Sequence, residues 1–518
     1  MIRRPTTLAP KPDWFRILVF LLPPVMYLLC LGSAPLFDVD EGAFSEATRE
    51  MFERGDFLST YLNGEHRFDK PILIYWLQAL AYLALGPSEW AFRLPSALAA
   101  IAWCYATWHF ARQRFGADAA LAALAVASTS LGPMIIGRAA TADALLNLLL
   151  ALTLFDAWRH LESGRRLPLL RSFLWMGLGA LTKGPIAILV PAAVTLLYCA
   201  SRGHWRRWLK AVADPLGWLI FLLLVVPWYA AALNIHGQLF IDGFVLRHNV
   251  ERFSGTLEGH GGSIAYYLFA VPLLLLPWTG PLFAAIRGLR DDLATGVRRL
   301  LWIWAAFVVA FFSLSGTKLP HYVLYGCTPL FLLIAAHRDD LKRVWAHGLP
   351  PAILMAVYAM LPWILAALAA SQAGDAYSRA QLGRAVAETS PFYVLATFGG
   401  IACWAALFHL SRVPIWRRLA SAGALQGLLL VVFVVPLAGE LAQGPVKRAA
   451  LALRETGEPV TLMSYTAPSF SVYRQAVTPR RQPEPGGLAV TRIDRVPDSG
   501  YRTVGVEGGV VILRRQMP

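Results

Sequence analysis

The chain has 518 residues, of which 57% are hydrophobic and 15% are charged. Soluble domains have roughly 45–50% apolar and about 25% charged residues, so this composition excludes a soluble globular protein and predicts an all-α polytopic membrane protein. The formal net charge of +15 does not indicate nucleic-acid binding, because Lys and Arg of membrane proteins collect in cytoplasmic loops. The five cysteines lie in apolar segments without a CxxC pair, which predicts neither a disulfide framework nor a thiolate metal site.

A membrane-spanning helix needs about 20 mostly apolar residues. Thirteen stretches are predicted to be spans: 14–34, 90–111, 118–136, 139–158, 168–182, 185–200, 215–233, 264–286, 300–315, 319–336, 349–370, 391–410 and 419–438. The apolar run 71–86 is a further candidate, but counting it as a span would put Arg112 and Arg114 outside the cell. We therefore assign this run to a helix along the membrane surface.

With this assignment, about half of the Lys and Arg residues fall in short loops on one side, which the positive-inside rule identifies as cytoplasmic. The N-terminus is then predicted to be cytoplasmic and the C-terminus to be periplasmic. The long polar loops 35–89, 234–263 and 371–390 all face outward.

After residue 438 the pattern becomes that of a soluble domain. We predict helices at 445–456 and 467–473, and strands at 459–464, 488–491, 502–506 and 510–513. The chain is thus divided into a transmembrane domain, 1–438, and a small α/β domain, 439–518. A domain of this size is near the lower limit for an independent core, so we expect it to lean on the membrane part.

The loop 35–89 is the longest strongly polar run before the tail. Asp38, Asp40 and Glu41 open it, a helical pattern follows at 43–54, and Asp69-Lys70 closes it. One interpretation is that Asp38 and Asp40 cap the helix, because carboxylates favour a helix N-terminus. The other is that the loop is the working site of the protein.

Further polar groups fall on the same outer face. They are Asp143 in GRAATAD, Lys183 in LTKGP, Trp228 and Tyr229 in PWY, His248 and Arg252 in HNVERF, His260, and Lys318 and Tyr322 in TKLPHY. The alternative for each cation is that it snorkels at a span end. The aromatic residues are also typical of an interfacial belt, and the histidines of a solvated loop.

As a set, these motifs resemble the GT-C membrane glycosyltransferases of the protein O-mannosyltransferase superfamily. They are most similar to the bacterial branch that contains the lipid A aminoarabinose transferase. The resemblance also takes in the SEATREM helix and Phe68-Asp69-Lys70-Pro71. It covers essentially the whole chain in order.

The resemblance implies a GT-C fold and inverting transfer of a sugar from an undecaprenyl-phosphate donor at the periplasmic face of the bacterial inner membrane. It makes Asp40 the catalytic carboxylate, with Glu41 and Asp143 as further candidates. The residues implied to bind the donor phosphate are Lys70, Arg252, Lys183, Lys318 and Tyr322.

The resemblance also implies a zinc ion, for which the candidate ligands are Asp69, His248 and His260. Two residues depart from the family pattern, because Asp69 replaces a glutamate and Phe44 replaces a tyrosine. No nucleotide cofactor is expected, since a lipid-linked donor needs no Gly-rich nucleotide loop and none is evident.

The expected acceptor is lipid A or a similar glycolipid, because the tail from Gly439 carries eleven Lys and Arg against seven acids and would favour an anionic lipid. The alternatives are a protein O-glycosyltransferase, a lipid-linked sugar transporter and a polymer ligase. The chain is expected to act as a monomer among membrane lipids.

Overall fold

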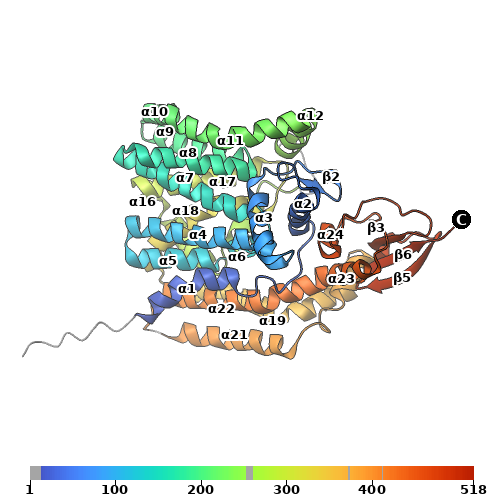
Figure 1. Cartoon of the computed structure of the whole chain (residues 1–518). Helices are drawn as coiled ribbons and strands as arrows, with labels where there is room; N and C mark the ends of the chain where they lie inside the picture. The colour runs from blue at the N-terminus through green and yellow to red at the C-terminus, as the bar shows by residue number, and fades with distance from the viewer. Residues whose placement is uncertain (1–12, 252–260, 372–373, 411, 518) are drawn as a thin grey trace, which may run out of the picture.

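The structure is a computed structural model that describes residues 13–251, 261–371, 374–410 and 412–517, without the side chains of 248–250. Long helices lie side by side in a bundle (Figure 1). The helices α2 (Asp40–Arg54) and α3 (Leu73–Leu85) lie at one end of this bundle, beside the C-terminal sheet. The basic helix α10 (Trp205–Val212) lies at the opposite end, as the charge assignment predicts.

Each of the thirteen predicted spans falls on a helix or on consecutive helices of the bundle. These are α1 (Trp14–Leu28), α4 (Glu89–Phe115), α5 (Ala117–Thr129), α6 (Leu131–Gly137), α7 (Asp143–Ser163), α8 (Arg166–Lys183), α9 (Ile186–Ser201), α11 (Pro215–His236), α14 (Tyr266–Leu274), α15 (Thr279–Arg287), α17 (Gly296–Leu314), η2 (Pro320–Gly326), α18 (Cys327–Ala336), α19 (Val344–Ala370), α21 (Pro391–His409), α22 (Ile415–Leu429), η4 (Leu430–Val434) and α23 (Val435–Thr456). Shorter helices connect them: α12 (Gln238–Phe240), η1 (Ile241–Glu251), α16 (Leu289–Asp292), η3 (Arg338–Asp340) and α20 (Ala376–Leu382).

The chain is a multi-pass membrane protein. Among the described residues, six helices are long and apolar enough to cross a membrane, or up to eight if each of two bent pairs is one span. Other helices of the bundle are shorter or more polar, such as α1 and α9. The count of thirteen spans therefore stays a prediction.

The helices from α22 to α23 carry the chain out of the bundle. Together they run from Ile415 to Thr456, 42 residues, which at 1.5 Å per residue is about 63 Å. The hydrocarbon core of a bilayer is only about 30 Å thick, so the end of α23 must project from it. The predicted domain boundary at 438/439 lies inside α23, which joins the two parts as one continuous helix.

The C-terminal sheet contains β3 (Val460–Leu462), β4 (Leu488–Arg492), β5 (Tyr501–Glu507) and β6 (Val510–Arg515) in the order β3-β4-β6-β5. The strands β3 and β4 are parallel and the other pairs are antiparallel. The helix α24 (Pro468–Arg474) lies in the connection between the parallel strands. Every secondary-structure element predicted in the tail is confirmed.

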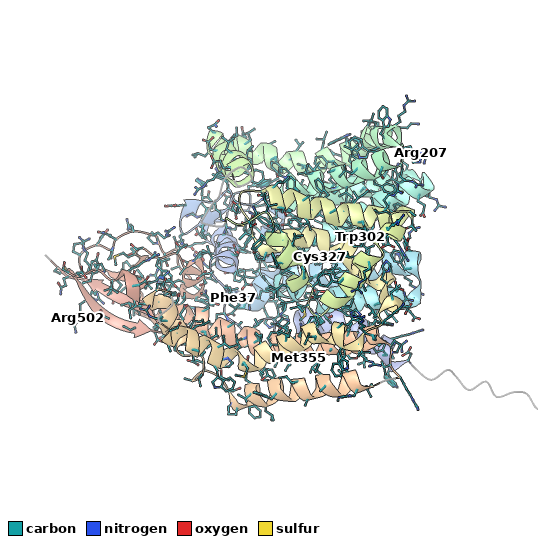
Figure 2. The ribbon with its side chains drawn as sticks, turned by 180° about the vertical axis from the view of Figure 1, so that it is seen from behind. Phe37, Arg207, Trp302, Cys327, Met355 and Arg502 are labelled. Carbon is teal, nitrogen blue, oxygen red and sulfur yellow. The ribbon has the colours of Figure 1, made fainter. Side chains whose placement is uncertain are left out.

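The core of this small domain is shared with the membrane part. Leu36 from the polar loop, Phe92 from α4 and Ala140 pack in one buried cluster with Phe470 and other tail residues. Figure 2 shows Phe37 at the junction between the bundle and the sheet, with Arg502 on the far side of the sheet. The expectation that the domain leans on the membrane part is confirmed.

The orientation of the chain is tested by labelling single cysteines in a variant that lacks the five native ones. We expect a cysteine at Gln482 to react with a membrane-impermeant maleimide in intact spheroplasts, and one at Arg206 to react only after permeabilisation. Both positions are exposed and lie in the tail and in α10. Labelling of position 206 in intact spheroplasts would overturn the assigned topology.

Candidate active site

The helix α2 is polar but mostly buried, and its charges after Asp40 are paired within the protein. Arg49 binds Glu46 at 2.7 Å and Glu53 at 2.6 Å. The carboxylate of Glu50 accepts a hydrogen bond from the amide of Gly64 at 3.2 Å. These contacts fix α2 against its surroundings, because separating buried partners would leave uncompensated charges.

The capping interpretation of Asp38 and Asp40 is wrong. The residue before α2 is Val39, and no side chain caps the first turn. Asp38 instead accepts hydrogen bonds from the amide of Ser469 at 2.9 Å and from its hydroxyl at 2.5 Å. Burial raises the pKa of Asp38 to about 7, although the bonds from Ser469 oppose this shift.

Glu41 is held from the other side, by the membrane bundle. Arg93 of α4 donates from Nε to Oε1 at 2.8 Å and from Nη2 to Oε2 at 2.7 Å. The backbone amides of Phe37 and Ala140 also donate to this carboxylate. Burial alone would raise the pKa of Glu41, but the charge and hydrogen bonds of Arg93 lower it. A carboxylate so fully bonded holds the loop in place.

Asp40 lies between these two anchored carboxylates and is exposed. No hydrogen bond or ion pair to the Asp40 carboxylate is formed by the residues that the structure describes. Its side chain lines two separate cavities. Of the three acids that open the loop, Asp40 is therefore the one available to a substrate.

The first cavity, here called the lysine cavity, has a volume of about 60 Å³. It is lined by Asp40, Phe44, Asp69, Lys70, Ile136, Thr141, Asp143, Lys183, Leu319, His321 and Tyr322. The structure thus brings together six residues that the sequence singled out from four separate segments.

Ion pairs orient the two lysines of this cavity. Lys70 binds Asp69 at 2.5 Å, and Arg67 also binds this carboxylate at 2.8 Å. Lys183, at the end of α8, binds Asp143 at 2.5 Å, while its ammonium lies 5.5 Å from the centre of the Tyr322 ring. Paired lysines of this kind offer a phosphate hydrogen-bond donors in a fixed position.

The second cavity, here called the membrane-side cavity, has a volume of about 370 Å³. Its lining combines the charged residues Asp38, Asp40, Glu41, Arg93 and Arg138 with aliphatic side chains of the bundle, among them Met134, Ile135, Leu430, Val434 and Val435. Such a mixed lining suits an amphipathic ligand.

Asp40, Ile136 and Thr141 line both cavities. The Thr141 hydroxyl is buried and has no hydrogen-bond partner in the described part of the chain. Leaving a buried hydroxyl without a partner costs about 1–3 kcal/mol, so a bound substrate that reaches it would gain this energy.

One predicted site residue lies away from the two cavities, and three others cannot be placed. Lys318 is buried, donates to the carbonyl of Ser315 at 2.7 Å and lines neither cavity. Arg252 and His260 lie outside the described residues, as does the side chain of His248.

Within the described ranges, no three His, Cys, Asp or Glu residues group as a metal site. Both oxygens of Asp69 already bind the side chains of Arg67 and Lys70. The proposed reaction therefore uses no metal, and the zinc site stays a prediction.

Sequence reasoning missed Arg93, His321 and Tyr325 as site residues. Tyr325 donates from its hydroxyl to Asp143 at 2.7 Å. A signal for Arg93 existed, because an ionisable residue inside an apolar segment usually has a partner or a function. Nothing in the sequence indicated that Ser469, far along the chain, would bind Asp38.

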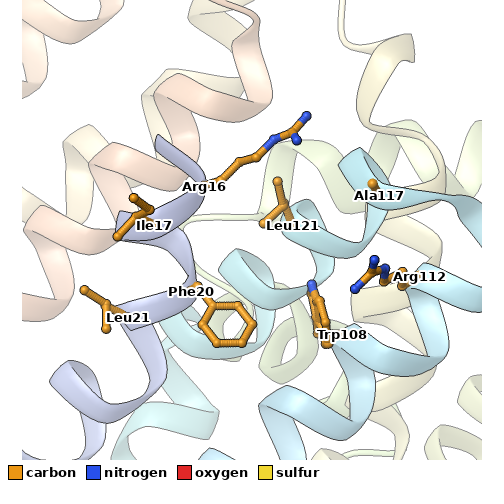
Figure 3. Close-up of a pocket in the computed structure, with 8 residues that line it drawn as sticks. All are labelled: Arg16, Ile17, Phe20, Leu21, Trp108, Arg112, Ala117 and Leu121. Atoms are coloured by element: carbon orange, nitrogen blue, oxygen red, sulfur yellow. The ribbon is translucent and has the colours of Figure 1, made fainter. Parts of the chain in front are cut away.

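A larger groove of about 410 Å³ lies between α1, α4 and α5 (Figure 3). Arg16 and Arg112 line it, together with apolar side chains and no carboxylate. It is formed where α1 and α5 begin and α4 ends, at the predicted cytoplasmic side. The acidic loop is absent from this groove, so we place the chemistry at the two cavities around Asp40.

Comparison with known proteins gives the fold. Residues 69–230 match the family model described as dolichyl-phosphate-mannose-protein mannosyltransferase. The crystal structure of ArnT from Cupriavidus metallidurans bound to undecaprenyl phosphate superposes with a TM-score of 0.81, over 96% of this chain and 97% of that one, at 21% identity. This chain has the GT-C fold. The resemblance to the aminoarabinose transferase-like branch is confirmed.

Curated relatives of this GT-C protein are named undecaprenyl phosphate-alpha-4-amino-4-deoxy-L-arabinose arabinosyl transferases. The one from Aeromonas salmonicida is 30% identical over 370 residues, which cover 67% of this chain and 65% of the relative. The one from Edwardsiella ictaluri is 26% identical over 81% of this chain and 76% of the relative. The GT-C chain thus matches about two thirds to three quarters of the length of these relatives.

We expect Arg93→Leu to destabilise this GT-C protein by about 3–5 kcal/mol, because it leaves the buried Glu41 charge without its partner. The measurement is the unfolding midpoint of purified protein in detergent. Arg112→Leu is the control, because Arg112 is exposed and, within residues 13–251, 261–371, 374–410 and 412–517, forms no ion pair; its guanidinium lies 5.4 Å from the Trp108 ring. Equal midpoints for the two variants would contradict the anchoring role of Arg93.

Proposed function

We propose that this chain is an inverting glycosyltransferase that moves a sugar from a polyprenyl-phosphate donor, undecaprenyl in bacteria, to an acceptor at the periplasmic face of the inner membrane. The observation that carries the proposal is the position of Asp40, which lines the lysine cavity on one side and the membrane-side cavity on the other. A carboxylate between two substrates is the arrangement that a single displacement needs.

In the proposed reaction, an acceptor oxygen attacks the anomeric carbon of the sugar. The bond from that carbon to the phosphate oxygen breaks, and its electron pair leaves with the polyprenyl phosphate. Asp40 orients the acceptor oxygen and takes its proton if it carries one. Lys70 and Lys183 bind the phosphate, whose negative charge grows as the bond breaks. One displacement inverts the anomeric centre.

The two anchored acids take no proton in this scheme. Glu41 is bonded to Arg93 and to two backbone amides, and Asp143 is bonded to Lys183 and Tyr325. Their contribution is to hold the loop and the lysine in place. Asp40 is therefore the proposed catalytic residue among the three candidate acids.

For the acceptor we propose a phosphorylated glycolipid such as lipid A. The support comes from the membrane-side cavity, whose aliphatic lining suits acyl chains. Arg138 in its wall is buried, donates to the carbonyls of Met26 and Cys30, and has no carboxylate partner among the described residues. The tail supports this acceptor less than its composition suggested, because Lys447, Arg448, Arg492 and Arg514 are paired with acids.

A protein hydroxyl as acceptor remains the second candidate, since the family model that matches residues 69–230 carries the name of a protein mannosyltransferase. A peptide would need a polar, extended groove, whereas the cavity beside Asp40 is largely aliphatic.

We expect Asp40→Asn to lower turnover by about 10²-fold or more, the usual scale for loss of a general base, while the protein still folds and inserts. The assay compares lipid A masses from cells that carry wild-type or variant protein. Asp498→Asn, an exposed carboxylate of the tail, is the control and should behave as wild type. A sugar-sized mass increase on a protein rather than on lipid A would show that the acceptor is a protein, and would leave the proposed reaction unchanged.

We expect Lys70→Gln to raise the donor KM by about tenfold or more, because a hydrogen bond to a charged group contributes about 1.5–3 kcal/mol. Lys318→Gln is the matched comparison, since this equally buried lysine lines neither cavity. The measurement is initial rate against donor concentration in detergent or nanodiscs. An unchanged donor KM for Lys70→Gln would assign this lysine to the Asp69 ion pair alone.

A further inference from the structure

The small C-terminal domain has no role in the chemistry described above, yet its helix α24 lies directly against the start of α2. Ser469, the second residue of α24, donates two hydrogen bonds to the Asp38 carboxylate, 2.9 Å and 2.5 Å long. Asp38 is separated from Asp40 by one residue. The tail is thus bonded to the segment that presents the proposed catalytic carboxylate.

The approach of the two helices is too close for a side chain larger than hydrogen. A Cβ atom at Gly42, in the first turn of α2, would lie 2.6 Å from the amide nitrogen of Ser469. Gly42 therefore lets α24 reach Asp38. The backbone on either side of Asp40 is thus packed against the tail.

Further contacts fix the same segment on its N-terminal side. The Tyr473 hydroxyl, from the last turn of α24, accepts a hydrogen bond from the amide of Leu36 at 2.7 Å and donates to Glu89 at 3.0 Å. Lys447 of α23 binds the same Glu89 carboxylate at 2.6 Å. The tail therefore forms hydrogen bonds with Leu36 and Asp38 and packs against Gly42. Within the same segment, Glu41 is bonded to Arg93 of the bundle.

We propose that Asp38 and Ser469 form a positioning clamp, through which the C-terminal domain holds Asp40 in place between the lysine cavity and the membrane-side cavity. This inference rests on the proposed function, because it assigns Asp40 the catalytic role. The clamp explains why a domain outside the membrane shares its core with Leu36 and Phe92. Asp38 also lines the membrane-side cavity, but both of its carboxylate oxygens accept hydrogen bonds from Ser469. In this scheme Asp38 and Ser469 therefore act through the backbone of Asp40.

The test uses a matched pair of serines on α24 in the full-length protein. Ser469 and Ser471 are both fully buried, and each hydroxyl bonds a residue of the loop 35–89. Ser471 bonds Asn63, however, which is far from Asp40 in sequence. Loss of either hydroxyl removes one buried hydrogen bond, but only Ser469→Ala weakens the hold on Asp38, which then keeps the bond from the backbone amide of residue 469.

We expect Ser469→Ala to lower kcat by about ten- to a hundredfold, the cost of misplacing a reacting group, and to leave the donor KM unchanged because Lys70 and Lys183 are untouched. Ser471→Ala should keep the wild-type kcat. Asp38→Asn should retain most of the activity that Asp38→Ala loses, since its amide oxygen still accepts from the Ser469 amide. Equal kcat values for the two serine variants would overturn the clamp.

Hydrogen exchange gives a readout that needs no turnover. We expect faster amide exchange over residues 37–42 in Ser469→Ala and not in Ser471→Ala, because local opening follows the contacts that are lost. Equal amide exchange rates over residues 37–42 in the two variants would mean that the contact between Ser469 and Asp38 is only ordinary packing of the tail. If the wild-type protein transfers no sugar, the proposed function fails, and the exchange comparison still decides the clamp.

Discussion

The arrangement on which the site depends is a row of three acids, of which the outer two are bound and the middle one has no partner in the described part of the chain. Asp38 is bonded to the C-terminal domain and Glu41 to Arg93 of the bundle. A buried carboxylate is tolerated only when its charge and lone pairs are satisfied. Satisfying both outer acids leaves Asp40 as the group of this row that can act on a substrate.

This arrangement also explains why a polar helix is buried at the membrane surface. The charges of α2 are bonded to one another and to the following loop, so the helix forms part of a rigid frame. The lysines of the site are also fixed by ion pairs, because Asp69 orients Lys70 and Asp143 orients Lys183. Electrostatic catalysis requires such fixed dipoles and charges, since groups that must reorganise during the reaction give up much of their effect.

The two cavities that meet at Asp40 divide the recognition of the substrates between them. The lysine cavity is small and polar, and the membrane-side cavity is larger and mostly aliphatic. In the proposed reaction, a lipid-linked donor and a lipid acceptor would both come from the bilayer, so a site between bundle and outer domain could receive both without a nucleotide-binding loop. Thr141 lies in the wall common to both cavities with an unsatisfied hydroxyl, where a transferred sugar would pass.

The sequence by itself determined much of this protein. Its long apolar stretches placed the helices of the bundle, because the bilayer demands such segments whatever their neighbours. The change to a soluble pattern after residue 438 located the four tail strands, and the polar segments singled out Asp40, Asp69, Lys70, Asp143, Lys183 and Tyr322. These are local signals, readable from spacing and charge.

Only the tertiary structure decided which of these residues act together. Apart from the family resemblance, charge and spacing do not distinguish Asp40 from Asp38 and Glu41, or Lys183 from Lys318. The reason is that partners from distant segments leave no local pattern. Ser469 lies 431 residues from Asp38 and Arg93 lies 52 residues from Glu41. Packing brought these partners together, and the pairing of each charge decided whether it is free to meet a substrate.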